Sequence, residues 1–491
     1  MKKARSHYTL FIHSFIAPHS SSRASGSRNE RHSVRSLMRG LARASSTNAL
    51  ARISRASSTS SSSARLLDSI LERASRAIPR DDVDGEPSTT SARTFAVGLS
   101  GGVDSAIAAW ALKRTGARVV GTLARNWDEA NEDDGDEREC AYVEDRKSAR
   151  ECAETLRLDD FVEVDFRREY WLDVFEPYVE AFESGATPNP DLECNRRVKF
   201  GALLRRATET MGATYLATGH YARIDRTRGG VRLMRGVDAS KDQSYFLASV
   251  SAEALTRACF PLGETLKTEV RDAARALRLP CAERRSSAGI CFIGRKPFGN
   301  FISEYIEPKR GAFVDVETGR DVPGAPPHRG SAAYTVGQRA KIGGASKPWF
   351  VVGKDAGTNV VYVASGADHD ALFSTTCAVT DAFWVSGARP RGVDVGARLL
   401  AKTRYASPLT PVIVRSTSTT DEPMIPSRYS SSYRSRESPS SSSSSLVVDF
   451  LHPERAVTPG QALVLYDGDV CLGGGIVERV GPSLFESNAR A

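Results

Sequence analysis

The stretch "AVGLSGGVDSAIAAW" (96–110) decides the fold of this 491-residue chain. The apolar residues up to Leu99 predict a strand, Ser100-Gly101-Gly102 predicts a tight turn, and the residues from Val103 onward predict a helix. Such a strand–glycine–helix junction binds anions, because backbone N–H groups and the helix N-terminus point at the ligand. The common nucleotide-binding loop carries a lysine after its glycines, whereas the next lysine here is Lys113. The loop therefore predicts a phosphate site, but not one built for transfer of a γ-phosphoryl group.

Predicted strands and helices alternate on both sides of this loop. We expect further strands at 117–124, 160–166 and 213–221, and helices at 141–156 and 199–212. Repeated strand–helix units form parallel sheets, with ligand sites at the carboxyl ends of the strands. From about residue 300 the pattern changes to short β-like runs separated by Gly and Pro, which predicts one or two small β domains.

The charge of the chain is concentrated at its beginning. Residues 1–80 hold 15 Lys and Arg but only 3 Asp and Glu, a net of +12, whereas the whole chain carries +8. The remainder is therefore net −4, and the basic pI is weak evidence for nucleic-acid binding by the folded part. A beginning rich in Arg, Ser and Ala and poor in acids is typical of an organellar transit peptide, although a generic basic tail has the same composition. We expect a mitochondrial or chloroplast protein, and no apolar run is long enough to span a membrane.

Two compositional features limit the chemistry. The eight cysteines contain no C-x-x-C pair, which argues against a zinc ribbon or a metal cluster built on close cysteine pairs. Any special cysteine must therefore act singly or with a partner that is distant in the sequence.

The Ser-rich stretch 415–445 predicts a disordered surface insertion.

The phosphate loop has a specific composition. The glycines let the backbone approach phosphate oxygens, Ser100 and Ser105 add hydroxyl donors, and Asp104 could act through a bound Mg²⁺. The motif Ser-Gly-Gly-x-Asp-Ser resembles that of the PP-loop ATP pyrophosphatases. That resemblance implies cleavage of ATP between the α and β phosphates and adenylation of a substrate oxygen.

The segment "TPNPDLECNRRVKF" (187–200) is a candidate nucleophile site. Two prolines stiffen the turn, Asp191 is placed to start a helix, and Cys194 falls in its first turn, where the helix dipole lowers the pKa of a thiol. A lone cysteine is otherwise often a small buried hydrophobe, and that alternative stays open at this point. A second candidate, Cys291 in "SSAGICFIG" (286–294), reads by itself as part of a core strand.

These motifs together resemble the tRNA-specific 2-thiouridylases of bacteria and organelles over roughly 95–412 and 447–482. The resemblance rests on the PP-loop and on five motifs that follow it in one order. They are "TPNPDLECNRRVKF", "ATGHYAR" (217–223), "KDQSYFL" (241–247), "GICFIG" (289–294) and "YTVGQR" (334–339). The implied fold class is α/β: a parallel-sheet PP-loop (adenine nucleotide alpha hydrolase-like) domain, a small central domain and a C-terminal β-barrel-like domain.

The resemblance also implies a mechanism and partners. ATP, as its Mg²⁺ complex, would adenylate O2 of the wobble uridine of tRNA. A sulfurtransferase or cysteine desulfurase relay would load a persulfide on Cys291, with Cys194 as nucleophile and Asp191 as acid/base group. The products would be 2-thiouridine, AMP, pyrophosphate and a disulfide between the two cysteines.

The remaining site residues carry over by position. The implied ATP contacts are Gly98, Leu99, Ser100, Gly101, Gly102, Val103, Asp104, Ser105, Ala124 and Gly219. The implied tRNA contacts are Asn189, Pro190, Asp191, His220, Lys241, Asp242, Gln243, Arg404, Tyr405 and Gln461. Ala124 departs from the family, which usually has methionine there, and Ser286 and Ala288 replace the usual Asp and Thr around the second cysteine.

We expect a transit peptide or disordered leader at 1–93 that takes no part in the fold, a PP-loop catalytic domain at 94–295, a small central domain at 296–366 and a C-terminal β domain at 367–491 that contains the disordered Ser-rich insertion 415–445. Within the leader, residues 55–78 could form a basic amphipathic helix. Two other functions remain open. One is a different PP-loop adenylating enzyme, which would not need the cysteine pair. The other is a catalytically idle tRNA-binding protein.

Overall fold

The computed structural model describes residues 46–79, 93–127, 141–226, 230–285, 298–344, 346–416, 424–433 and 445–489. By its contacts the chain divides into two units, Met1–Arg65 and Leu66–Ala491. Apart from the beginning of helix α2 (Ser46–Ala77), the elements named below lie in the second unit. Within the described ranges, no helix combines the length and apolar character needed to cross a bilayer.

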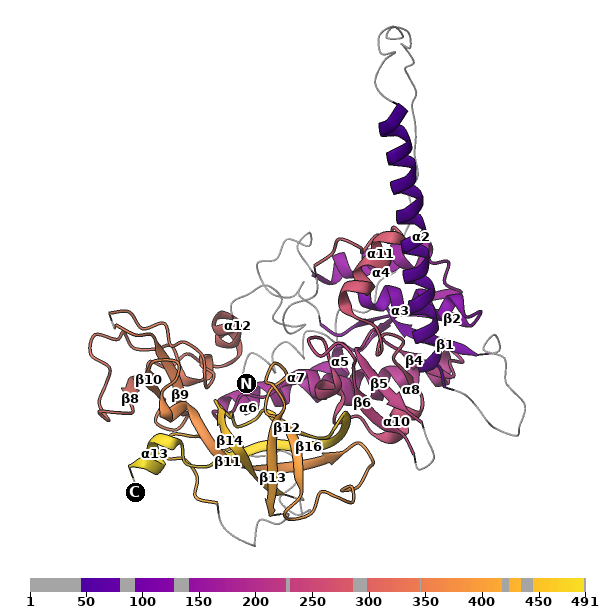
Figure 1. Ribbon diagram of the computed structural model, residues 1–491. Helices are drawn as coiled ribbons and strands as arrows, with labels where there is room; N and C mark the ends of the chain where they lie inside the picture. Colours follow the sequence, from indigo (N-terminus) through magenta and orange to yellow (C-terminus); the bar gives the residue numbers. More distant parts are fainter. Residues whose placement is uncertain are drawn as a thin grey trace, which may run out of the picture. The chain divides into compact units, whose positions relative to one another are not determined.

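A five-stranded parallel sheet forms the first domain, with the strand order β3-β2-β1-β4-β7. Figure 1 labels β1, β2 and β4 of this sheet. Its strands are β1 (Thr94–Gly98), β2 (Arg118–Arg125), β3 (Asp160–Asp165), β4 (Tyr215–Ala217) and β7 (Ala258–Cys259). The central strand β1 pairs with β2 on one side and with β4 on the other. The order therefore reverses between β1 and β4, and the loops that follow these two strands diverge at the carboxyl edge, where parallel sheets bind ligands.

Helices cover this sheet because parallel strands need crossover connections. Helix α3 (Val103–Arg114) follows β1 directly and is almost wholly buried, which fits its alanine-rich, apolar composition. It packs against α11 (Lys267–Ala276). The other helical elements of the domain are α4 (Ala141–Thr155), α5 (Arg167–Tyr170), η4 (Trp171–Phe175), α6 (Glu176–Glu183), α7 (Pro190–Glu193), η5 (Cys194–Leu203), α8 (Leu204–Thr210), α9 (Ser244–Leu247) and α10 (Ala252–Thr256).

A small central domain follows helix α12 (Phe298–Tyr305). Its three-stranded sheet has the order β8-β10-β9, and a separate apolar cluster centred on Val351, Val361 and Val363 packs on it. The strands are β8 (Phe313–Asp315), β9 (Trp349–Asp355) and β10 (Val360–Ser365), with the short 3₁₀ turns η6 (Ser331–Ala333) and η7 (Asp370–Leu372).

The C-terminal domain is a closed antiparallel β-barrel. Strands β11-β14-β13-β12-β15-β16 pair in that order, and β16 pairs back with β11 to close the ring. They are β11 (Phe373–Trp384), β12 (Arg398–Lys402), β13 (Thr410–Ser416), β14 (Leu446–Arg455), β15 (Ala462–Asp467) and β16 (Val470–Val480), followed by helix α13 (Leu484–Asn488). The parallel-sheet domain, central domain and barrel predicted from the sequence are thus confirmed.

A hairpin of the first domain joins the barrel. Strands β5 (Ala222–Asp225) and β6 (Arg232–Arg235) extend the barrel sheet, because β6 pairs with β16 at Leu233 opposite Cys471. The first and last domains therefore share one continuous sheet.

Two expectations about disorder need correction. Residues 66–79 were expected in the leader segment, yet Ile70, Ala74 and Ile78 are buried in the core of the first domain. These three residues recur every four positions and form one apolar stripe of the amphipathic segment that the sequence predicts at 55–78, but nothing in the sequence shows that this stripe packs into the domain. The expectation that 1–93 lies outside the fold is therefore wrong for this segment.

The Ser-rich stretch is also partly folded. Met424 is buried, and the ring of Tyr429 packs on Tyr362 with centroids 5.1 Å apart. Disorder throughout 415–445 is therefore wrong for 424–433, because these residues supply apolar contacts that the serines do not. It is also wrong for Arg415 and Ser416, which end strand β13, and for the buried Ser445. Residues 417–423 and 434–444 lie outside the described residues.

Candidate active site

The phosphate loop leaves β1 at the reversal point of the sheet. Gly101 has a φ of +73°, and a Cβ at this position would lie 2.5 Å from the carbonyl oxygen of Asp145. Only glycine fits this conformation and this space. Ser148 Oγ and Arg284 Nη1 donate to the carbonyl of Gly101 at 2.8 and 2.9 Å, so the turn is fixed from two other elements.

The N-terminus of α3 is left open toward the loop. Gly102 is the N-cap residue, and no side chain caps the helix. Ser105 Oγ instead accepts a hydrogen bond from the N–H of Ser100 (3.2 Å) and donates to the carbonyl of Gly102 (3.0 Å). The serines thus shape the loop, while the first turn of this twelve-residue helix offers its backbone N–H groups to an anion.

The lysine that the loop sequence lacks comes from another element. Lys267, the first residue of α11, donates from Nζ to both carboxylate oxygens of Asp104 at 2.6 Å. Tyr221 donates its hydroxyl to the same carboxylate at 2.7 Å. Burial and the adjacent carboxylate raise the pKa of Tyr221, so its phenol stays protonated. Neither contact was foreseen, because 163 and 117 positions separate these residues from Asp104 and only the fold brings them together.

Gly219 and Ala124 both lie at the carboxyl edge of the sheet. Gly219 follows β4, and a Cβ there would lie 2.7 Å from the carbonyl carbon of Asp104. Its lack of a side chain lets β4 approach α3. Ala124 is near the end of β2, two residues beyond Thr122, which pairs with Gly98. The structure therefore gathers the expected ATP contacts at one edge.

The Asn189–Cys194 segment begins a helix, as the sequence predicts. Asn189 Oδ1 accepts from the N–H of Asp191 at 3.0 Å, so Asn189 is the N-cap and Pro190 is the first helical residue. Cys194 lies one residue beyond the first turn, and its N–H already donates to the carbonyl of Pro190. The expected place in the first turn is thus missed by one residue, because the helix begins at Pro190 rather than Asp191.

The two reactive groups of this segment differ in environment. Cys194 is a buried thiol. Asp191 is half-buried, and burial raises the pKa of its carboxyl group, while the charge of Lys199 partly opposes this shift. A carboxyl group with a raised pKa holds its proton more readily than an ordinary aspartate, which suits an acid/base group. Cys291, the proposed partner of Cys194, lies outside the described residues, as do Ser286 and Ala288.

Residues of the barrel hydrogen-bond the backbone of Thr187, just before this segment. Gln461 Nε2 donates to the carbonyl of Thr187 at 2.7 Å, and the N–H of Thr187 donates to the carbonyl of Pro459 at 2.8 Å. A Cβ on Gly460 would lie 2.9 Å from the Thr187 nitrogen, so the two backbones are in close contact. In this conformation the Gln461 amide binds the backbone of the protein itself. A contact between Gln461 and RNA would require this hydrogen bond to break.

The central domain also binds the backbone just before this segment. The buried Lys354 of β9 donates from Nζ to the carbonyls of Ala186 (3.3 Å) and Tyr334 (2.9 Å). Burial lowers its pKa to about 7. Ser431 Oγ, from the folded part of the insertion, donates to the carbonyl of Gly185 at 2.9 Å. Three separate parts of the chain therefore fix residues 185–187.

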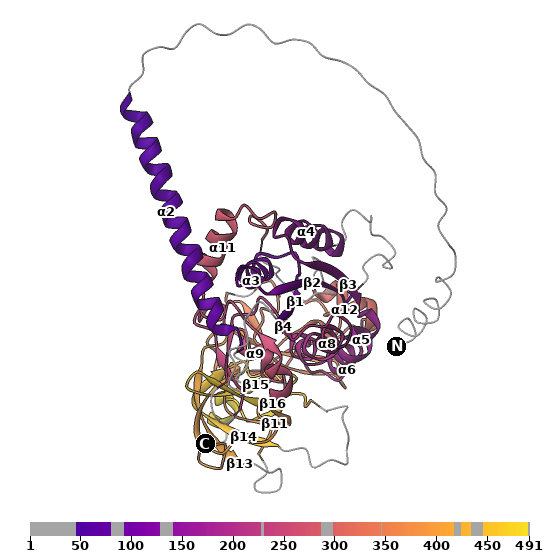
Figure 2. The same cartoon turned by 90° about the vertical axis from the view of Figure 1, so that its right-hand side faces the viewer.

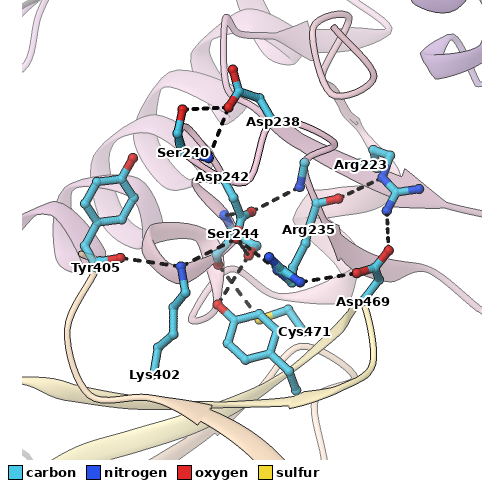
Figure 3. Close-up of polar contacts among 12 residues, drawn as sticks. Arg223, Arg235, Asp238, Ser240, Asp242, Ser244, Lys402, Tyr405, Asp469 and Cys471 are labelled. Carbon is cyan, nitrogen blue, oxygen red and sulfur yellow. Dashed lines mark hydrogen bonds and ion pairs between the residues drawn. The ribbon is translucent and has the colours of Figure 1, made fainter. Parts of the chain in front are cut away.

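Asp242, expected to contact tRNA, is the centre of a buried network instead (Figure 3). Its carboxylate accepts from the N–H groups of Gly236 (3.0 Å) and Ser244 (3.1 Å) and from Ser244 Oγ (3.1 Å). Arg235 Nε lies 3.4 Å and Lys402 Nζ 3.8 Å from it. A side chain enclosed in this way does not reach an RNA, so the expected contact is corrected for this conformation.

The residues beside Asp242 differ in exposure. Lys241 is exposed and available to a ligand. Gln243 Oε1 accepts from the N–H of Tyr221 at 3.0 Å, which couples this turn to the tyrosine that contacts Asp104.

The other expected tRNA residues lie at the joint of the first domain and the barrel. Tyr405 stacks on Phe246 with centroids 4.3 Å apart, and Arg404 donates to the carbonyl of Arg455 at 2.9 Å. His220 is buried in one cluster with the rings of Phe200 and Phe260, and burial lowers its pKa well below the usual value, so it is neutral at pH 7. The aromatic surroundings of His220 favour a structural role for its ring.

Comparisons with known proteins agree with this architecture. Residues 93–295 match a family model described as tRNA methyl transferase HUP domain, residues 299–365 match a tRNA methyl transferase PRC-barrel domain, and residues 426–477 match an aminomethyltransferase beta-barrel domain. The tRNA-specific 2-thiouridylase MnmA of Streptococcus thermophilus (strain LMD-9) is 40% identical over 390 residues, which cover 78% of this chain and 94% of that protein. The protein of the same name from Pediococcus pentosaceus is 40% identical over 389 residues, with the same coverage.

Proposed function

This chain belongs to the tRNA-specific 2-thiouridylase family, and from this premise we propose that it replaces O2 of the wobble uridine of tRNA by sulfur at the expense of ATP. The observation that carries the proposal is that one domain holds both halves of the chemistry. A phosphate loop completed by Lys267 suits adenylation, and a helix with Asp191 and Cys194 suits sulfur transfer.

The first step is adenylation. The uridine O2 attacks the α-phosphorus of ATP, and pyrophosphate leaves. The N–H groups of the Ser100–Ser105 loop and the Lys267 ammonium would bind the pyrophosphate, since both offer positive charge at the same edge of the sheet. Adenylation turns a poor leaving group into AMP, which a sulfur nucleophile can displace.

The second step is sulfur transfer. The terminal sulfur of a Cys291 persulfide attacks C2 of the base and displaces AMP. The Cys194 thiolate then attacks the Cys291 sulfur, which releases 2-thiouridine and leaves a disulfide between the two cysteines. The sulfane sulfur is reduced while the two thiols are oxidised, so an external thiol must reduce the disulfide before the next turnover. We propose that a sulfurtransferase or cysteine desulfurase relay loads Cys291.

We propose that magnesium enters as the ATP complex. The described residues contain no group of three or more His, Cys, Asp or Glu that would hold a metal. The Asp104 carboxylate is moreover occupied by Lys267 and Tyr221. When bound, Mg²⁺ would supply charge neutralisation on the phosphates.

A single-turnover assay without reductant tests the proposal. With ATP, tRNA and a persulfide donor, the wild type should give AMP, about one thiolated tRNA per enzyme and a Cys194–Cys291 peptide link. Cys291→Ser should still form AMP but accept no persulfide, and Cys194→Ser should load sulfur on Cys291 without delivering it. Cys377→Ala, in the barrel core, is the matched control.

The alternatives predict other results in the same assay. ADP as product would exclude PP-loop chemistry. AMP formation without thiolated tRNA in the wild type would favour a different adenylating enzyme, whereas unchanged thiolation in either cysteine variant would reject the paired-cysteine mechanism. Tight tRNA binding without AMP in the wild type would favour an idle binding protein.

We also propose that the beginning of the chain directs import into a mitochondrion or chloroplast. The basic, acid-poor composition of residues 1–65 supports this proposal. A fluorescent protein fused behind residues 1–65 should enter one of these organelles, and a fusion that stays in the cytosol would contradict it.

A further inference from the structure

The last turns of helix α2, from Leu66 onward, pack beside helix α11, whose first residue is Lys267. In the second unit, Ile70, Ala74 and Ile78 share one core cluster with Val270 and Ala273 of α11. Figure 2 shows helices α2 and α11 side by side. Cys259 Sγ, at the end of β7, also donates to the carbonyl of Ala77 at 3.5 Å. The last turns of α2 are therefore built into the domain on the side of α11.

Arg73 fastens this segment to the loop that precedes α11. Its guanidinium makes two parallel hydrogen bonds to Glu269, both 2.9 Å long, and Nη1 lies 3.2 Å from the carbonyl oxygen of Glu264, to which it donates. Bidentate arginine–carboxylate pairs are strong and fix orientation. This pair is also shielded, since only 18% of the Arg73 side chain and 27% of the Glu269 side chain are exposed.

Glu269 passes this constraint to the start of α11. Its carboxylate accepts from the N–H of Leu266 at 2.8 Å, so the side chain caps the helix that it belongs to. Arg73 therefore holds the 264–266 loop at both of its ends, through the Glu264 carbonyl and through Glu269.

Lys267 follows this loop directly. Its N–H donates to Asp238 at 2.9 Å, and its ammonium group reaches Asp104 of the phosphate loop. The backbone of Lys267 is thus fixed by Asp238 on one side and by the loop that Arg73 holds on the other.

We propose that residues 66–79 are a positioning element of the ATP site, and that Arg73 is a positioning residue that acts through Glu269 on Lys267. This inference rests on the proposed function, because that function assigns Lys267 to the pyrophosphate. The match to the HUP-domain family model begins at residue 93, so the element lies outside the matched part. The N-terminal part of the chain therefore has two proposed roles. Residues 1–65 direct import, and residues 66–79 remain in the mature protein and position the ATP site.

The test measures nucleotide binding and turnover separately in the full chain. Binding of α,β-methylene-ATP, which cannot be cleaved between the α and β phosphates, gives a Kd by calorimetry. Release of AMP from ATP at saturating tRNA gives KM and kcat. Arg73→Ala should raise the Kd for the analogue and the KM for ATP by about tenfold. This is the change expected when a displaced Lys267 no longer makes one charge-assisted hydrogen bond to the nucleotide.

Two further variants keep the result interpretable. Arg275→Ala removes an exposed arginine pair near the other end of α11 and should leave the Kd within about twofold. Glu269→Gln retains a cap for the helix but not the charge, and it should raise the Kd even if Arg73→Ala fails to fold.

Each outcome decides something. A lower melting temperature with unchanged Kd and KM in Arg73→Ala and Glu269→Gln would reduce the segment to a purely structural part and overturn the inference. Analogue binding without AMP release in the wild type would reject the proposed function, while the Kd comparison would still test the role of Arg73.

Removal of a leader in the organelle must leave residues 66–79 in place if they position the ATP site. The mature protein isolated from the organelle should begin at or before residue 66. A mature N-terminus beyond residue 73 in active enzyme would contradict it.

Discussion

At the scale of single residues, Asp104 illustrates how the fold completes the loop. A carboxylate beside a phosphate site would repel the ligand, yet Lys267 and Tyr221 both donate to it. The ion pair is partly enclosed, because 12% of the Lys267 side chain and 35% of the Asp104 side chain are exposed. The pair therefore keeps the loop free of net negative charge and retains a cation for pyrophosphate.

Lys267→Ala should reduce AMP formation by about 10²–10³-fold, the range for removing one preorganised group that stabilises developing charge. Binding of tRNA should change little. The measurement is AMP release at saturating tRNA and ATP, with Lys113→Ala, which loses only a half-exposed pair with Asp159, as control. Equal rates in the two variants would reject a role for Lys267 in the ATP site.

Asp191 should show its raised pKa in the stability of the protein. Because burial raises this pKa, the folded protein binds the proton more tightly than the unfolded chain. The stability from this group is fully present below the unfolded pKa and is lost as the pH rises through the folded pKa. Asp191→Asn, which stays neutral, should therefore unfold at higher urea than the wild type at pH 8, and the difference should shrink as the pH falls toward about 3.9, the ordinary pKa of an aspartate.

The same variant should lose thiolation, because the acid/base group is gone. A stability difference independent of pH would show that the Asp191 carboxyl has an ordinary pKa.

At the scale of elements, the 185–194 segment depends on its neighbours. Its own sequence specifies the N-cap and the prolines, but Gln461 and Lys354 fix the backbone that precedes them. A lysine enclosed in this way loses hydration, and that loss is what lowers its pKa to about 7.

Lys354→Met should abolish a pH dependence of stability. The unfolded chain keeps this lysine protonated up to a pKa of about 10.4, whereas the folded protein releases the proton near pH 7. The wild type should therefore gain stability relative to Lys354→Met as the pH rises from 7 to 9, at up to about 1.4 kcal/mol per pH unit. Urea unfolding at pH 7, 8 and 9 measures this gain, and the exposed Lys347→Met is the control. A constant difference would contradict a depressed pKa.

At the scale of the whole molecule, short segments join the domains. The hairpin β5–β6 extends the barrel sheet from the first domain. Residues 424–433 join the barrel to the central domain, since the N–H of Ser427 donates to Val480 of β16 and Ser430 bridges to Lys354 of β9. The carbonyl of Tyr429 also lies where a Cβ on Gly353 would be, so the two backbones are in close contact.

Tyr429→Ala should lower the stability of the protein by about 2 kcal/mol, roughly half the cost for a fully buried aromatic, because the ring is half-buried on Tyr362. The urea midpoint measures the change. Ile425→Ala, in the same segment but with a side chain 59% exposed, should shift the midpoint little. Equal shifts would show that the segment does not brace the two domains.

The sequence alone determined what depends on local contacts. The alternation of strands and helices predicted the parallel sheet, and the glycines predicted the turn at Gly101, because strands, helices and turns follow from side-chain pattern and backbone freedom within a few residues. Only the tertiary structure decided which distant groups complete the site. It brought Lys267 to Asp104, buried Asp242 away from solvent and made residues 66–79 part of the domain. These outcomes depend on how helices and domains pack, and a local pattern carries no record of the partner that a side chain meets across a hundred residues or more.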